Sequence, residues 1–250
     1  MKGISSVVFV GLLLDFIPLL GAAEIRISVE DPRPLRAAVR ELELALGYPI
    51  NYEDPAYPDD DVEDQTHRSY RGPGRLLLPR KGRIDVAVPS STQVPAKTIQ
   101  SLIEDHLKRK NPGLFALRPG GPPYTVAPAH NALLDTIISV EPGETTFMGA
   151  VLAIAESLTQ ATGIKVHGPG MLVGPRERFA FSSVGEPARV ALQKLFQPRT
   201  RQPEPIYVWD LLYAPGYGFV LNIHTVKVRS LRPDGSTTLE QLRAPAQQPD

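Results

Sequence analysis

Histidines are the side chains of this sequence best suited to proton transfer or metal binding, and they are widely separated: His67, His106, His130, His167 and His224. No pair has the i, i+4 spacing with which a helix presents two zinc ligands, and there is no glutamate-flanked metalloprotease motif. His106 lies beside apolar residues of a predicted helix, which indicates a partly buried structural histidine. His224 alternates with apolar residues in a predicted strand. The histidines therefore predict no metal site.

Carboxylates and hydroxyls give equally little support for catalysis. The pair Glu53-Asp54 could serve acid–base chemistry only if folding placed both side chains in a cleft. Ser182-Ser183 has no base nearby in the sequence, and the Gly-x-Ser-x-Gly elbow of many hydrolases is missing. The segment 168–170, Gly-Pro-Gly, is typical of a turn, because phosphate-binding loops need longer glycine motifs. We therefore assign no catalytic, cofactor-binding or metal-binding residue, and we expect no cofactor.

An acidic run lies in a long charged loop that we predict at residues 57–81. Its sequence, Asp59-Asp60-Asp61-Val62-Glu63-Asp64, offers the oxygen ligands that calcium prefers. It lacks the alternating ligand spacing and the turn glycine of an EF-hand loop. Basic residues follow it at Arg68, Arg71, Arg75, Arg80 and Lys81. We interpret the segment as a solvated, mobile loop, with calcium binding as the alternative.

Composition narrows the function classes further. The 250 residues include 27 Lys+Arg and 27 Asp+Glu, so the formal net charge is zero, and there is no cysteine. Disulfides, thiolate zinc sites, iron–sulfur clusters and cysteine nucleophiles are thereby excluded. Nucleic-acid affinity rests largely on clustered Lys and Arg, so we expect no nucleic-acid partner.

The first 23 residues are interpreted as a secretory signal peptide. They begin with a basic residue, continue with an apolar stretch, and end with Gly21 and Ala23, small residues that suit positions −3 and −1 of a cleavage site. An uncleaved anchor is the alternative, but residues 4–23 barely reach membrane-spanning length and contain Asp15. We predict export to the periplasm or the extracellular space, and a mature chain from Glu24 that does not span the membrane.

The mature chain reads as a β-α-β-β-α-β-β pattern written twice. Residues 25–29 alternate like a half-buried strand and precede a predicted helix that ends at Gly47. Residues 137–141 precede a helix that ends at Gly163 in the same way. The two helices carry apolar stripes with the same 4, 3, 4 spacing, 112 positions apart: Leu35, Val39, Leu42 and Leu46, and then Phe147, Val151, Ile154 and Leu158. We expect these stripes to be buried.

We accordingly predict an α+β fold of two tandem similar units, each a small mixed sheet covered by helices. The first unit spans residues 24–130 and the second spans residues 131–228. Their second helices are predicted at residues 95–110 and 187–196, and the former should direct four residues inward: Ile99, Leu102, Ile103 and Leu107. Residues 229–250 are rich in Pro, Gln and Arg, so we predict a flexible tail.

Two stretches resemble the short N-terminal module of secretins and TonB-dependent transducers. They read ISVED…PLRAAVRELELALGYPINYE and SVGEPARVALQKLF…IYVWDLLYAPGYGFVLNI. That module has a strand, a helix with a leucine-type stripe, a glycine and a strand, and then a closing hairpin. The chain also resembles exported bacterial proteins of similar layout. The chain differs from the secretin family in one respect: we expect neither a secretin barrel nor an outer-membrane β-domain in this sequence. The resemblance implies protein–protein contact in the periplasm and supplies no catalytic residue.

These patterns predict an exported, periplasmic protein–protein interaction or envelope-assembly module with an envelope protein as its partner. The alternative is an envelope hydrolase whose site is assembled only in three dimensions. A deep pocket lined by carboxylates or histidines with shifted pKa values would favour the hydrolase. An exposed sheet edge would favour the module, because an open edge can recruit a partner strand.

Overall fold

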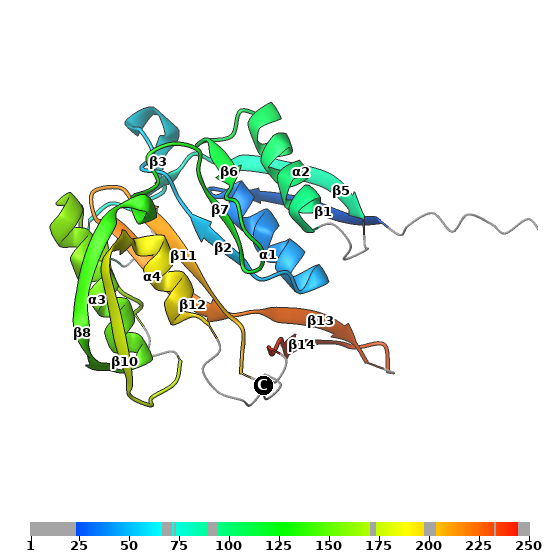
Figure 1. Ribbon diagram of the computed structural model, residues 1–250. Helices are drawn as coiled ribbons and strands as arrows, with labels where there is room; N and C mark the ends of the chain where they lie inside the picture. Colours follow the sequence, from blue (N-terminus) through cyan, green and yellow to red (C-terminus); the bar gives the residue numbers. More distant parts are fainter. Residues whose placement is uncertain are drawn as a thin grey trace, which may run out of the picture.

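The computed structural model describes residues 24–66, 72, 74–89, 95–170, 174–197, 204–232 and 234–244. Within these ranges the chain forms four α-helices and fourteen strands, which are arranged in several small sheets (Figure 1). Residues 1–23, the predicted signal peptide, lie outside the described part. None of the helices described has the length and the apolar character that a membrane span requires.

The first half of the chain supplies β1 to β7 with helices α1 and α2. In chain order these are β1 (Glu24–Asp31), α1 (Pro34–Leu46), β2 (Ile50–Glu53), the 3-10 helix η1 (Asp59–Asp61), β3 (Val62–Asp64), β4 (Leu77–Pro79), β5 (Gly82–Pro89), α2 (Pro95–Lys108), β6 (Phe115–Leu117) and β7 (Tyr124–Pro128). A second 3-10 helix, η2 (Leu133–Asp135), leads into the second half.

The second half supplies β8 to β14 with helices α3 and α4. In chain order these are β8 (Ile137–Thr145), α3 (Phe147–Thr162), β9 (Val166–His167), β10 (Phe179–Pro187), α4 (Ala188–Leu195), β11 (Tyr207–Ala214), β12 (Gly218–Thr225), β13 (Lys227–Leu231) and β14 (Thr237–Gln241). Helices and strands therefore mix along the whole described chain, as the α+β prediction requires.

One six-stranded sheet joins the two halves, with the strand order β6-β7-β2-β11-β12-β9. Strand β2 pairs with β7 and β11 in parallel, β9 pairs with β12 in parallel, and β6 with β7 and β11 with β12 are antiparallel. Two antiparallel pairs, β1 with β5 and β8 with β10, lie at opposite sides of the molecule (Figure 1). The sequence analysis predicted a separate sheet for each unit, which is wrong, because the β2–β11 pairing makes the sheet continuous.

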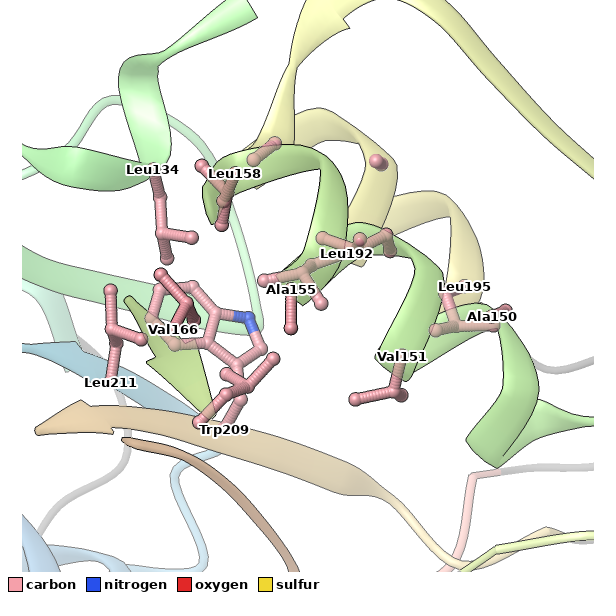
Figure 2. Packing of buried hydrophobic residues seen from close by; sticks show 14 of the residues in the cluster. Leu134, Ala150, Val151, Ala155, Leu158, Val166, Leu192, Leu195, Trp209 and Leu211 are labelled. Atoms are coloured by element: carbon pink, nitrogen blue, oxygen red, sulfur yellow. The ribbon is translucent and has the colours of Figure 1, made fainter. Parts of the chain in front are cut away.

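The helices bury their apolar stripes in two separate cores. One core contains Leu35, Val39 and Leu42 of α1, with Leu46 only partly buried against it, and the other contains the complete α3 stripe. Figure 2 shows Trp209 of β11 pointing from its strand toward the helices of the second core. Leu211 belongs to that core while its neighbour Leu212 packs against the first core. Because side chains alternate along a strand, the two cores lie on opposite faces of β11.

Helix ends form where the sequence supplies the required backbone conformation. Gly47 and Gly163 both adopt the left-handed conformation after their helices, with φ of 69° and 70°, and each donates its amide hydrogen to a carbonyl of the last turn. This conformation is strained for residues with a Cβ atom, so glycine ends both helices cleanly. At the start of α3 the Thr146 side chain accepts a hydrogen bond from the Gly149 amide.

Two segments that were predicted as a mobile loop and a flexible tail contain antiparallel strand pairs where the structure describes them. In the predicted charged loop, β3 pairs with β4, and Arg75 binds Asp64 at 2.8 Å. In the predicted flexible tail, β13 pairs with β14, and Arg229 lies 3.0 Å from Glu41 of α1. In the charged segment the ion pair joins residues on the two sides of the β3–β4 pair, and in the tail it connects β13 to α1.

Candidate functional site

The two halves meet where β2 runs parallel to β11, and we call this junction the seam. Asp210 lies opposite Tyr52 and Leu211 lies opposite Glu53. The Asp54 amide donates a 2.8 Å hydrogen bond to the Leu211 carbonyl oxygen. Asn51 extends the pairing through its side chain, because its Oδ1 atom accepts a 3.1 Å bond from the Trp209 amide. The seam is thus a short ladder of backbone bonds that is lengthened by one side chain.

A buried ion pair crosses the seam on the face of the second core. Arg189 of α4 donates a 2.7 Å hydrogen bond to Oε2 of Glu53, and Oε1 of Glu53 accepts a 3.0 Å bond from the Leu134 amide. The Arg189 guanidinium also binds Asp135 at 3.0 Å and lies 5.9 Å from the centre of the Trp209 ring. Burial raises the pKa of Glu53, and the charge of Arg189 opposes that rise.

A second set of ion pairs crosses the seam on the opposite face. Asp210 of β11 is fully buried and binds Arg36 of α1 at 2.8 Å and also Arg40 of the same helix. Arg40 also contacts Glu43. Burial would raise the pKa of Asp210, but the nearby charges of Arg40 and Arg36 outweigh it and hold that pKa below its usual value. Each half therefore supplies a buried carboxylate that the other half's arginines neutralise.

Asp54 closes the seam at its end. Its carboxylate accepts hydrogen bonds from Arg33 at 2.6 Å, from the hydroxyls of Tyr52 and Tyr57 at 2.9 Å, and from the Tyr213 amide at 3.0 Å. Burial raises the pKa of Asp54, with Arg33 acting against that rise. With all its acceptor positions engaged and almost no exposed surface, this carboxylate is a structural group rather than an acid or base for a substrate.

Three surface hollows surround these elements, and the seam carboxylates Glu53, Asp54 and Asp210 line none of them. One of about 410 Å³ has His224, 3.5 Å from Glu43, in its wall. A second of about 470 Å³ lies between the halves and is lined by Trp209, Tyr207, Phe196 and the loop 119–123, among others. The third, of about 540 Å³, includes Leu107 and Leu114 in its lining. The carboxylates with shifted pKa values therefore do not line these three hollows.

The residues weighed in the sequence analysis do not come together. His106 is buried, and its Nε2 atom lies 3.1 Å from the carbonyl oxygens of Pro112 and Gly113. His167 stacks on Tyr217 with 3.8 Å between ring centroids. In the described part of the chain no three His, Asp or Glu side chains could jointly hold a metal ion. His67 lies outside that part.

The two ends of the six-stranded sheet carry exposed apolar side chains. We call the surface around β6 the β6 end, with Leu107 and Leu114, and the surface around β9 the β9 end, with Leu152, Ile164 and Tyr217. Each of these side chains belongs to a residue that is 40–58% exposed. Leu107 was predicted to point inward, but His106 occupies that buried position on α2 instead.

The sheet ends, like the seam, were not predicted from the sequence. Leu114 and Ile164 lie just before short strands, and Tyr217 lies in a hairpin turn. Nothing in the local pattern distinguishes such residues from buried ones, so only the strand order identifies them as edge residues. In the described part of the chain neither β6 nor β9 pairs with a strand on its outer side.

Comparison with known proteins adds no identity to this geometry. No protein-family model matches the chain, and no curated protein and no solved structure is significantly similar to it.

Proposed function

We propose that this chain is an exported protein–protein interaction or envelope-assembly module, built from two copies of one β-α-β-β-α-β-β unit joined at the seam. Its working surfaces are the two ends of the central sheet. The observation that carries the proposal is the contrast between charged groups used within the molecule and apolar groups exposed at its open sheet ends.

The strand pairings support the two-copy architecture. In the first half β6 is antiparallel to β7, which is parallel to β2. In the second half β11 is antiparallel to β12, which is parallel to β9. The antiparallel pairs β1–β5 and β8–β10 also occupy matching places in chain order. On this basis β2 corresponds to β9, and β6 corresponds to β11.

Burial and hydrogen bonding agree with the same correspondence. Five of the six buried residues of α1 recur on α3 112 positions later: Leu35 and Phe147, Ala38 and Ala150, Val39 and Val151, Leu42 and Ile154, Glu43 and Ala155. After α3's extra turn the interval becomes 116, which relates Gly47 to Gly163. In both halves the carbonyl before the next strand accepts a matching bond, from Tyr124 to Pro49 and from Phe219 to Lys165.

An interaction role is favoured because the buried carboxylates of the seam are already engaged within the molecule. Glu53, Asp54 and Asp210 are buried and paired with arginines, so they are not available to a substrate. Exposed apolar side chains beside strands with an unpaired outer edge are typical of surfaces that recruit a partner. The resemblance to the short N-terminal module of secretins and TonB-dependent transducers implies the same kind of role.

Site-specific cross-linking tests this proposal. A photo-reactive amino acid placed at Leu114 or Tyr217 should give discrete cross-linked species in envelopes of the producing cells. The same group at Leu231, which is 77% exposed and lies on the β13–β14 hairpin, is the matched control and should give none. Equal cross-linking at all three positions, or none at the two sheet ends, would contradict the proposal.

A further inference from the structure

The seam and the free ends of the sheet are formed by corresponding edges. At the seam, the outer edge of β2 meets the outer edge of β11 in parallel. The counterpart of β2 in the second half is β9, and the counterpart of β11 in the first half is β6. These two strands are the outermost strands of the six-stranded sheet. The molecule therefore exposes, one at each end, the same two edges that it joins internally.

We propose that copies of this chain associate head to tail, with β6 of one copy pairing in parallel with β9 of the next. This inference rests on the two-copy architecture proposed above and names the partner of the sheet ends as a second copy of the chain. Its class of contact is heterologous, because two different surfaces meet, so the association extends as an open row unless it closes into a ring.

The relative directions of the strands satisfy this geometry, with the two copies related by a shift along the sheet and by the rotation that the sheet's twist imposes. Strand β6 is antiparallel to β7, and β7, β2 and β11 all run in the same direction. Strand β9 is parallel to β12, and β12 is antiparallel to β11. Strands β6 and β9 therefore run in the same direction. A second copy shifted along the sheet would bring its β6 beside β9 in the parallel orientation that β11 has beside β2.

The seam also supplies a register for this contact. Asp210 and Ala116 are counterparts, because they face Asn222 and Ala127 at matching positions of their hairpins. Tyr52 corresponds to Gly168, so Ala116 of one copy would lie opposite Gly168 of the next, and both residues are small. The Gly170 amide would donate to the Leu117 carbonyl, as the Asp54 amide does to Leu211 at the seam.

Pro169 does not obstruct this pairing. It corresponds to Glu53, and in a parallel strand alternate residues direct their backbone groups to opposite sides. Because the Asp54 amide points to β11, the Glu53 amide points away from the seam. The missing amide hydrogen of Pro169 therefore lies on the side of β12 of its own copy, and the backbone groups of Gly168 and Gly170 are the ones directed to β6 of the next copy.

The side chains at the two sheet ends differ in character from their counterparts at the seam. At the seam, Arg36 and Arg40 of α1 reach Asp210 of β11. Their counterparts at the free ends, 112 positions later on α3 and at the matching place on β6, are Met148, Leu152 and Ala116.

The counterparts of all three charged seam residues are therefore apolar. Met148 and Leu152 belong to one end of the sheet, and Ala116 belongs to the other. If only one end had changed, a charge would be buried against an apolar surface, which is costly. Two surfaces that face water independently have no reason to match, whereas two surfaces that face each other do. Leu152 also lies against Gly168, the residue that directly follows β9, so it lies at the proposed contact.

Sedimentation velocity on the purified chain over a concentration series tests the inference. We expect the sedimentation coefficient to rise with concentration. Leu152→Arg and Ala116→Asp should each weaken self-association by at least about tenfold, because each introduces an unpaired charge into an apolar contact. Leu231→Arg makes the same change on the β13–β14 hairpin and should leave association unaltered. Unchanged thermal unfolding of each variant shows that it remains folded.

Mixing the two variants provides the decisive measurement. An equimolar mixture of L152R and A116D should regain association, because one of its contacts combines the charges that meet at the seam and the other is unchanged. Failure of the mixture to form even pairs would overturn the head-to-tail contact, because the unchanged contact alone supports pairs, and association that stops at pairs would overturn the proposed register. Association that persists in both variants, or a wild-type chain that is monomeric at every concentration, would overturn the head-to-tail contact. In the latter case, cross-links from the sheet ends to a different protein would leave the proposed function intact.

Discussion

Replacing Arg189 by Met tests whether the charged seam holds the two halves together. The change keeps an apolar side chain of similar length but leaves the fully buried Glu53 carboxylate with the Leu134 amide as its remaining hydrogen-bond donor. Removing one partner of a buried ion pair costs about 3–5 kcal/mol, because the other charge stays desolvated. The lost cation–π contact with Trp209 adds about 0.5–2 kcal/mol.

The loss of stability in this variant should depend on pH in a defined direction. Burial already raises the pKa of Glu53, and removing the Arg189 charge raises it further. A carboxyl group whose folded-state pKa lies above its unfolded value destabilises the protein as pH rises through the folded-state pKa. The difference in unfolding free energy between wild type and R189M should therefore be larger at about pH 8 than at about pH 5.

Urea unfolding at both pH values measures this difference. Glu53→Gln combined with R189M should recover most of the stability, because an amide oxygen still accepts the Leu134 bond and no charge is buried. Arg178→Met is the matched control: Arg178 is exposed, lies 3.8 Å from Glu144, and should contribute less than about 1 kcal/mol. A loss in R189M no larger than that of R178M, or one that is independent of pH, would refute the argument.

Two further predictions concern local structure. Burial lowers the pKa of His106, whose Nδ1 atom has no hydrogen-bond partner among the described residues. This group therefore stabilises the fold above its unfolded pKa, and that stabilisation is lost as pH falls through the folded-state pKa. Wild type should therefore lose more stability than His106→Gln between about pH 7.5 and about pH 5 in urea unfolding. Gly218 has φ of 104°, and a Cβ atom there would overlap the Lys165 carbonyl oxygen. Gly218→Ala should cost at least about 1–3 kcal/mol by the same measurement, whereas Gly143→Ala, at a residue with open space around it, should cost little.

Local periodicity predicted the helices and their buried stripes well. Phe147, Val151, Ile154 and Leu158 are all buried, because the 4, 3, 4 spacing describes one face of a helix whatever it packs against. The same reasoning was wrong for Leu107, where His106 takes the buried place on α2. A histidine whose ring nitrogen reaches two backbone carbonyls can occupy an apolar face, and a hydrophobicity pattern does not register this.

The seam could not be predicted because its contacts join residues far apart in the chain. Glu53 and Arg189 are 136 positions apart, and Arg40 and Asp210 are 170 positions apart. A strand's sequence indicates which face is buried but not which neighbour its edge will pair with. From the sequence, Glu53 and Asp54 could serve acid–base chemistry only if folding placed both side chains in one cleft. The structure directs the two side chains to different arginines.

The chemistry of the seam and that of the sheet ends suit different tasks. The two halves are tethered by a short linker, so their effective concentration is high and the seam needs selectivity more than strength. Pairing the apolar β9 end with β11 of another copy would leave Asp210 without Arg36 and Arg40, and this cost disfavours exchange at the seam. Separate copies have no tether, and burying apolar surface supplies the free energy that their association requires. In the proposed assembly, charge therefore fixes the order within a copy, and apolar contact extends the sheet between copies.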